Sequence, residues 1–108
     1  MLTRVRTGGL DELRSCGARV GEVYTLRRGS RCVYYMVTKP RSSGTYPTLT
    51  TMRAALESLR TRVRADGVTQ LAMPRIGCGL DGLVWEEVRG IIRDVFANTS
   101  VTISVFTL

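Results

Sequence analysis

Histidine is the residue type that this chain of 108 residues lacks completely. Imidazole is the commonest general base and metal ligand in proteins, so its absence excludes many enzyme and metal-site classes. Cysteine is scarce, and Cys16, Cys32 and Cys78 form an odd set without a CxxC spacing. This usage is typical of reduced thiols, and no histidine is present to activate Cys78. We therefore expect an intracellular protein, cytoplasmic or nuclear, that needs no metal or other cofactor.

Long apolar runs are missing as well. No stretch approaches the roughly 20 apolar residues of a transmembrane helix, and the opening MLTRVRTGG lacks the apolar core of a signal peptide. Hydrophobic residues make up 44% of the chain and charged residues 23%. This balance, without repeats or linkers, predicts a single globular domain over residues 1–108 and no membrane partner.

Lysine is rare although the chain is strongly basic. The formal net charge is +7, and Lys39 is the one lysine among the 16 basic residues. Such a surplus favours polyanionic partners such as nucleotides or nucleic acid, while scattered arginines equally fit a soluble basic surface. Arginine keeps its proton near neutral pH, whereas a lysine amine can release it in a suitable site. Lys39 is therefore either retained for its amine or kept by chance.

Apolar spacing predicts alternating helices and strands. A short helix is expected over residues 8–15, and a β-hairpin over 22–27 and 31–38. The next helix follows the stripe Leu49, Met52, Leu56, Leu59 and Val63, with a cap at Thr48 or Thr50 and an end at Gly67. A buried strand over 68–73, a helix over 83–98 and a strand over 101–106 complete the chain. The alternation predicts an α/β fold with parallel pairing in the second half.

The loop PRIGCGLDG, residues 74–82, is the strongest candidate for a ligand site. In α/β sheets ligands bind beyond the carboxyl ends of strands, and this loop leaves a strand at that end, as does the segment that begins at Lys39. Its glycines permit close backbone approach, and successive N–H groups can form an anion nest. The loop lacks both the Walker and the GxGxxG patterns, so a purely structural glycine turn is the alternative.

Asp81 lies inside this loop and has two interpretations. From spacing alone, capping of the following helix is the more natural role. The alternative is chemical, because an amine and a carboxylate at one strand-end crevice suit nucleophilic and acid–base catalysis. Lys39, at the end of a neighbouring strand, would supply the amine.

Four segments together resemble the macrodomain family, in its terminal ADP-ribose glycohydrolase branch, also called O-acetyl-ADP-ribose deacetylase. These are VYYMVTKPR (33–41), TYPTL (45–49), LAMPRIGCGLDGLVWEEV (71–88) and TISVFTL (102–108). The resemblance extends from about Gly8 to Leu108. It implies a three-layer α/β/α sandwich with a mixed sheet, truncated at its N-terminus.

The resemblance also implies a ligand and a reaction. The ligand is ADP-ribose, free or attached to proteins, and the reaction hydrolyses its ester to glutamate or aspartate, or O-acetyl-ADP-ribose, without a metal. Lys39 would attack the anomeric carbon and Asp81 would resolve the adduct. The family pattern places these further residues around the ligand: Thr38, Pro74, Arg75, Ile76, Gly77, Cys78, Gly79, Leu80, Gly82 and Phe106, the last near the adenine.

The family's N-terminal segment, with its first strands and part of the adenine and ribose pockets, has no counterpart in this sequence. We therefore expect an exposed sheet edge, which invites a homodimer. Two further functions stay open: a module that binds ADP-ribose or its polymer without turnover, and a basic RNA-binding or dimeric structural protein. Retention of both Lys39 and Asp81 favours the enzyme, and the lack of a clustered basic and aromatic strip disfavours RNA binding.

Overall fold

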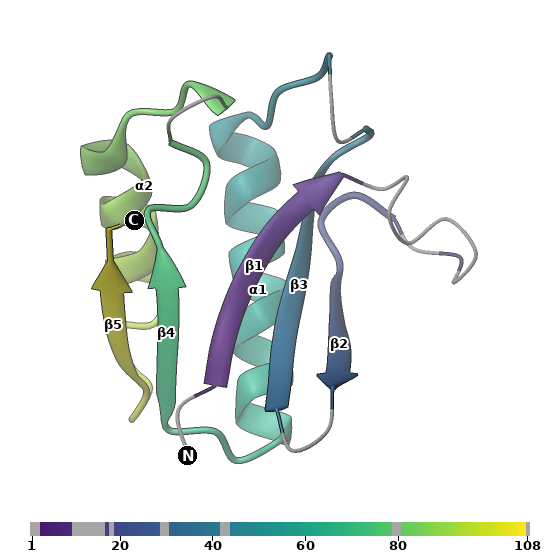
Figure 1. Cartoon of the computed structure of the whole chain (residues 1–108). Coiled ribbons are helices and arrows are strands. Elements are labelled where there is room, and N and C mark those ends of the chain that lie inside the picture. Colours follow the sequence, from purple (N-terminus) through teal and green to yellow (C-terminus); the bar gives the residue numbers. More distant parts are fainter. Residues whose placement is uncertain are drawn as a thin grey trace.

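The computed structural model describes residues 3–9, 17, 19–28, 31–41, 44–78 and 81–107. The elements follow the order β1 (Thr3–Gly9), β2 (Val23–Arg28), β3 (Arg31–Lys39), α1 (Leu49–Ala65), β4 (Gln70–Pro74), α2 (Trp85–Val95) and β5 (Thr102–Phe106). The strands form one sheet in the order β2-β3-β1-β4-β5 (Figure 1). No helix in these ranges has the length and apolar character needed to cross a membrane.

The sheet is mixed, as expected. Strands β2 and β3 pair antiparallel, from Val23 opposite Met36 to Arg28 opposite Arg31, and form the predicted hairpin. The other neighbours, β3 with β1, β1 with β4 and β4 with β5, run parallel. The carboxyl ends of these parallel strands therefore meet at one edge of the sheet (Figure 1).

Helix α1 forms where the predicted apolar stripe and the predicted caps mark the same segment of the chain. Thr48 and Thr51 make a reciprocal capping box, with the Thr48 hydroxyl accepting from the Thr51 N–H at 3.1 Å. The helix ends before Gly67, whose φ of +68° is the left-handed conformation that glycine adopts most easily. The predicted stripe is buried, apart from the partly exposed Leu49, and Ala55 joins it. This helix supplies the largest helical contribution to the core.

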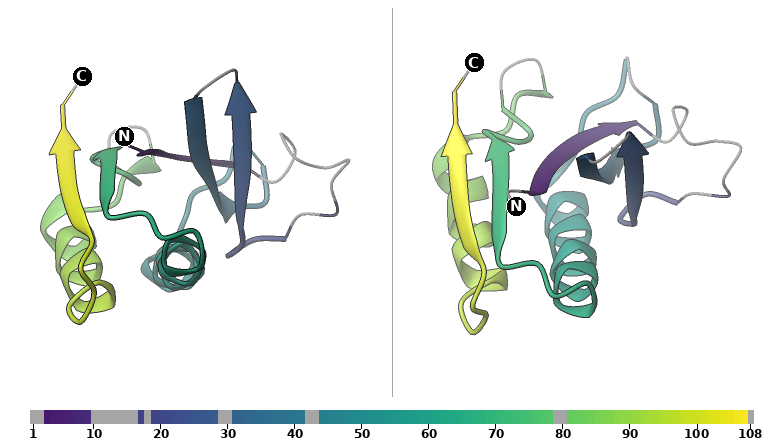
Figure 2. Two further views of the ribbon diagram at one scale, coloured as in Figure 1. Left: turned by 90° about the horizontal axis from the view of Figure 1, so that it is seen from below. Right: turned by 60° about the horizontal axis from the view of Figure 1, so that its bottom comes forward.

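Both helices pack against the same face of the sheet (Figures 1 and 2). The core between them is apolar and includes Val5, Tyr34, Met36, Leu71 and Met73 from the strands. On the opposite face, Tyr35 and Val37 form a smaller buried cluster with Val20 and Tyr24, and Arg4 and Arg6 are exposed. The described residues thus contribute the sheet and one of the two helical layers that the resemblance implies.

The N-terminal strand corrects the sequence interpretation. Gly8 and Gly9, expected in a helix, end strand β1, and the rest of that predicted helix, residues 10–15, lies outside the described residues. The strand was missed although Thr3 and Val5 are buried and Arg4 is exposed, the alternation of a half-buried strand. Since β1 lies between β3 and β4, the edges of the described sheet are β2 and β5.

Candidate active site

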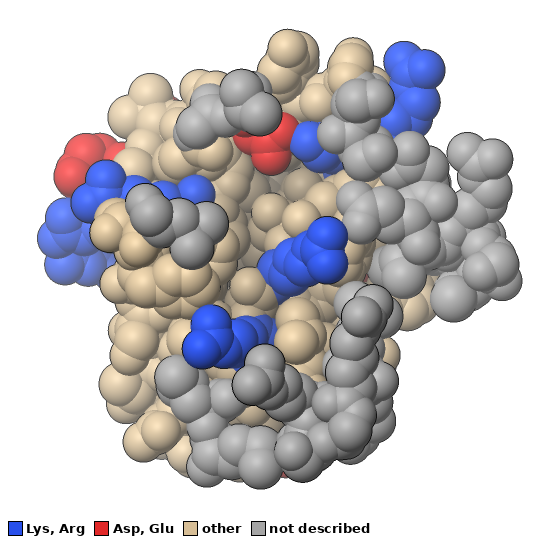
Figure 3. Space-filling model, viewed as in Figure 1, with Lys and Arg blue, Asp and Glu red and all other residues tan. Residues whose placement is uncertain are grey.

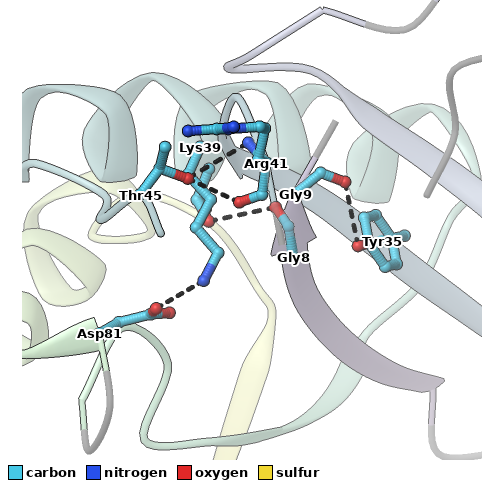
Figure 4. Close-up of polar contacts among 8 residues, drawn as sticks. Gly8, Gly9, Tyr35, Lys39, Arg41, Thr45 and Asp81 are labelled. Atoms are coloured by element: carbon cyan, nitrogen blue, oxygen red, sulfur yellow. Dashed lines mark hydrogen bonds and ion pairs between the residues drawn. The ribbon is translucent and has the colours of Figure 1, made fainter. Parts of the chain in front are cut away.

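Lys39 and Asp81 meet in an ion pair. The Lys39 ammonium donates to Asp81 Oδ1 over an Nζ–Oδ1 distance of 2.6 Å (Figure 4). The side chains are 10% and 20% exposed, so the pair is largely shielded from water but still reachable. Screening is weak in such a site, and charge-assisted hydrogen bonds are strong there. The two residues that the sequence singled out for chemistry therefore lie in direct contact.

The fold explains this contact between residues far apart in the chain. Lys39 is the last residue of β3, and Asp81 follows β4 in the loop that leads to α2. Strand β1 lies between β3 and β4, and all three run in the same direction. Their carboxyl ends therefore lie next to one another, and the long Lys39 side chain extends to Asp81 (Figure 4). This is the position where α/β sheets bind ligands.

The end of β1 also helps to position Lys39. The pairing of β1 with β3 shifts between Gly8 and Gly9, so that Gly9 lies opposite Lys39. The Thr38 hydroxyl donates to the Gly8 carbonyl at 3.4 Å. The Tyr35 hydroxyl donates to the Gly9 carbonyl at 3.3 Å (Figure 4). The sequence interpretation missed these glycines, although two adjacent glycines after an alternating segment signal close backbone approach.

Asp81 does not cap helix α2. The N-cap residue is Val84, which makes no side-chain cap hydrogen bond, and the helix begins at Trp85. The capping interpretation of Asp81 is therefore wrong, because the helix starts one turn later than the spacing suggested. What holds Asp81 in place is Lys39.

Gly77 and Gly82 allow the loop after β4 to turn. Both have positive φ, +74° and +77°. A Cβ at Gly77 would lie 2.7 Å from Met52 Cε and 2.8 Å from Leu83 Cδ1, whereas one at Gly82 would meet nothing within 4 Å. The Leu83 N–H donates to the Gly77 carbonyl at 2.9 Å and closes the loop. A side chain at Gly77 would thus have to displace the ends of Met52 and Leu83, while Gly82 leaves open space beside Asp81.

The remaining predicted ligand residues differ in exposure. Ile76 is buried in the core, and the partly buried Cys78 packs against the same core. Burial raises the pKa of the Cys78 thiol, and the nearby Arg75 guanidinium opposes this only in part. The thiol is therefore protonated near neutral pH and is a poor nucleophile, as the missing histidine already indicated. Gly79 and Leu80 lie outside the described residues.

Phe106 and Pro74 lie side by side at the ends of β5 and β4. The Arg4 guanidinium lies 5.7 Å from the centre of the Phe106 ring, on the face of the sheet away from the helices. Arg75 instead stacks on Trp85, 5.8 Å from its ring centre, on the α2 side. The roles of these residues in ligand binding stay predictions. Among the described residues, no three Cys, Asp or Glu side chains gather into a metal-binding group.

Two curated proteins match the chain over its whole length. ADP-ribose glycohydrolase OARD1 of Bos taurus is 44% identical over 108 residues, and the human protein of the same name is 43% identical. The match covers 100% of this chain and 70% of each relative. The chain belongs to the family of ADP-ribose glycohydrolase OARD1. The uncharacterized protein 032R of Invertebrate iridescent virus 6 is 36% identical over 87 residues, or 81% of this chain and 85% of the viral protein.

Solved structures agree on the fold of this OARD1-family chain. The macrodomain of Mycobacterium tuberculosis DarG matches with a TM-score of 0.82 at 16% identity, over 97% of this chain and 96% of that one. The macrodomain of Thermus aquaticus DarG matches with a TM-score of 0.76 at 17% identity, over 98% of this chain and 97% of that one. No model of a protein family matches the chain. The expected macrodomain resemblance is confirmed.

Proposed function

We propose that this chain hydrolyses ADP-ribose that is ester-linked to glutamate or aspartate, or O-acetyl-ADP-ribose. The observation that carries this proposal is the ion pair between Lys39 and Asp81 at the carboxyl ends of neighbouring strands. Two relatives named ADP-ribose glycohydrolase support the reaction class. The matching fold of Thermosipho africanus DarTG, solved in complex with ADP-ribose, supports the ligand, with a TM-score of 0.82.

In the first step, the Lys39 amine attacks the anomeric carbon of the distal ribose. A protonated amine has no free electron pair, so one proton first passes along the 2.6 Å contact to the Asp81 carboxylate. The C–N bond forms as the bond from the anomeric carbon to the ester oxygen breaks. The carboxylate of the modified glutamate or aspartate leaves with that bonding pair.

In the second step, Asp81 acts as general acid and base toward water. Asp81 first releases to solvent the proton that it took from Lys39. Its carboxylate then accepts a proton from a water molecule that attacks the anomeric carbon of the adduct, and the C–N bond breaks with its electron pair on the lysine nitrogen. The products are ADP-ribose and the free lysine amine, so one water is consumed in each turnover. The partly exposed Asp81 is placed to meet that water, because its side chain keeps 20% of its surface accessible.

The loop of residues 77–82 binds the diphosphate and distal ribose in this proposal. The open space at Gly82 and the positive φ of Gly77 let backbone N–H groups approach an anion closely. Phe106 lies at the end of β5 and contacts the adenine. This arrangement gives ADP-ribose an advantage over AMP, which lacks the distal ribose and one phosphate.

The test measures release of ADP-ribose from a glutamate-linked substrate. Lys39→Ala lowers the rate by at least about 10³-fold, because the nucleophile is gone. Lys39→Arg fails equally, since a guanidinium does not release its proton. In Asp81→Ala the Lys39 proton passes more slowly to water, but the base of the second step is gone, so an adduct accumulates that mass spectrometry detects as the protein plus one ADP-ribose unit.

Arg53→Ala and Asp94→Ala are the matched controls. These residues form another ion pair, with an N–O distance of 2.8 Å, between α1 and α2. Neither variant changes the rate more than twofold. Full activity of Lys39→Arg would overturn the mechanism. Calorimetric binding of ADP-ribose without any turnover would establish the alternative function, a binding module.

A further inference from the structure

The polypeptide that carries the modified residue comes close to Lys39 in the proposed reaction. Lys39 attacks the anomeric carbon, and only two methylene groups separate the ester carboxyl of a glutamate from its backbone. The polypeptide therefore passes over the residues that border the ion pair of Lys39 and Asp81. O-acetyl-ADP-ribose carries only a methyl group at the same place. The two substrates thus differ in whether they touch the rim of the site.

Two loops border the ion pair. One joins Lys39, at the end of β3, to helix α1, and the other leads from β4 through Asp81 to helix α2. The described parts of both loops lie at the end of the molecule where the carboxyl ends of the parallel strands meet (Figure 1). On the face seen in Figure 3, an acidic and a basic group lie side by side near this end, and a further basic group protrudes at the upper right.

Each of these loops exposes a large apolar side chain. Tyr46 is 68% exposed and Val84 is 56% exposed, and the other exposed large apolar residue in the described ranges, Val105, lies on β5. Val84 is also the N-cap of α2, where it makes no side-chain hydrogen bond. Serine, threonine, aspartate and asparagine stabilise this position, so an exposed valine there costs helix stability. Residues that break a local rule of folding are expected at functional sites.

The loop after Lys39 adds a positive charge. Arg41 is exposed, and the ion pairs among the described residues do not include it. Its backbone is held by Thr45, whose hydroxyl donates to the Arg41 carbonyl at 2.7 Å and accepts from the Arg41 N–H at 3.2 Å (Figure 4). An ordered loop loses little entropy when it binds, which favours the contact. We call Arg41, Tyr46 and Val84 the substrate rim.

We propose that the substrate rim binds the polypeptide that carries the modified residue, and that it selects acidic segments with apolar neighbours. This inference rests on the proposed function, because that function brings a modified polypeptide to Lys39. Charge argues for this occupant: carboxylates beside the modified residue pair with Arg41, whereas a second copy of this chain would bring a like charge. Apolar side chains of the segment remove Tyr46 and Val84 from water. Val84 offers no flat surface to a stacked base, which disfavours a polymer of ADP-ribose.

The test compares two substrates that release the same product. One is O-acetyl-ADP-ribose, and the other is the end-blocked peptide Glu-Leu-Glu-Leu-Glu with ADP-ribose esterified to its central glutamate. Both leaving groups are alkyl carboxylates, so the chemical step is nearly the same for the two. We expect kcat/KM to be at least about tenfold higher for the peptide. This advantage should shrink when lysine replaces the outer glutamates and when the salt concentration is raised.

Substitutions on the substrate rim should act on the peptide alone. Tyr46→Ser lowers kcat/KM for the peptide about tenfold and Arg41→Gln about threefold, and both leave O-acetyl-ADP-ribose within about twofold. The matched controls are Val105→Ser for exposed apolar surface and Arg64→Gln for exposed charge. They leave both substrates within about twofold.

Val84→Ser separates recognition from folding. Serine supplies the missing cap of α2, since Val84 already has the extended backbone of an N-cap, with φ −80° and ψ 123°. We therefore expect a higher midpoint of thermal unfolding together with a kcat/KM for the peptide that is about fivefold lower. Tyr46→Phe keeps the peptide activity, because the contact is apolar.

Calorimetry tests the substrate rim without turnover. The probe is the same peptide with a central glutamine, to whose amide nitrogen ADP-ribose is linked, so that no ester is present. It should bind at least about tenfold tighter than free ADP-ribose and lose this advantage in Tyr46→Ser. If neither ester is hydrolysed and this advantage remains, the proposed hydrolysis fails, while the substrate rim stands as part of a binding module.

Three outcomes overturn the inference. They are equal losses on the two esters in Tyr46→Ser, equal kcat/KM for the glutamate and lysine peptides, and an amide-linked peptide that binds no tighter than ADP-ribose. Tighter binding of a polymer of ADP-ribose with the same dependence on Tyr46 would also overturn it. A dimer in sedimentation that excludes the peptide would do the same and assign the substrate rim to a second copy.

Discussion

Gly77→Ala tests whether the loop beside Asp81 is built around a glycine. Two costs add at this position. A non-glycine residue in the left-handed region loses about 1–2 kcal/mol, and Gly77 has φ +74°. The new methyl group would also lie 2.7 Å from Met52 Cε and 2.8 Å from Leu83 Cδ1. Overpacking of this kind costs about 1–3 kcal/mol, so we expect a total loss of about 2–5 kcal/mol.

Gly67→Ala is the matched control for backbone strain. Gly67 has φ +68°, and a Cβ there meets nothing within 4 Å. Only the conformational cost of about 1–2 kcal/mol applies. Gly82→Ala, with φ +77° and equally open space, should match Gly67→Ala in stability. It differs in position, because Gly82 follows Asp81, so we expect a methyl group there to obstruct the proposed ADP-ribose site rather than the core.

Urea unfolding of the three variants measures these differences. The free energy of unfolding should fall most for Gly77→Ala, by about 1–3 kcal/mol beyond Gly67→Ala, without a change in the m-value. Calorimetry with ADP-ribose should then show weaker binding for Gly82→Ala than for Gly67→Ala. Equal destabilisation by Gly77→Ala and Gly67→Ala would refute the reasoning, since it would mean that Met52 and Leu83 do not confine the loop.

Further substitutions test the elements around the site. The buried Tyr34 hydroxyl donates to Asp66, and burial together with this carboxylate raises the pKa of Tyr34 above its ordinary value of 10.0. Unfolded Tyr34 therefore ionises first, so stability in urea should fall as pH rises above about 10, and less steeply in Tyr34→Phe; parallel curves would contradict this. Thr48→Ala removes the α1 cap and should cost about 1 kcal/mol in thermal unfolding, with Thr50→Ala near zero. Arg53→Ala breaks an exposed ion pair and should cost at most about 0.5 kcal/mol in the same assay.

Much of the fold was predictable because local and tertiary preferences coincide. The α1 stripe, the Thr48 cap and the left-handed Gly67 each appear in the sequence and recur in the structure. The hairpin and the parallel second half also follow from simple alternation. Helix α2 is shorter than predicted, because it spans Trp85–Val95 and the prediction was 83–98. The turns that flank the helix also pack on the core, so apolar residues continue past its ends and their spacing does not mark where the helix stops.

Strand β1 shows why the first residues were harder to interpret. TRVRTGG mixes arginine with β-branched residues and ends in two glycines, a composition that local propensity does not assign to a central strand. Its position comes from pairing on both sides, with β3 and with β4. Such pairing is non-local, so a window of sequence around residues 3–9 can show the alternation of a strand but not its place in the centre of the sheet.

The partner of Asp81 at the site could not be predicted from local sequence either. Spacing within the loop favoured an N-cap, because an aspartate before a helix usually accepts from the first turn. The helix instead begins at Trp85 after an uncapped Val84, which leaves the Asp81 carboxylate to find another partner. A partly buried carboxylate without one would be costly, and the lone lysine of the chain lies 2.6 Å away. The scarcity of lysine was thus the most informative sequence signal for the site, since arginine could have met a purely electrostatic need but could not serve as an amine nucleophile.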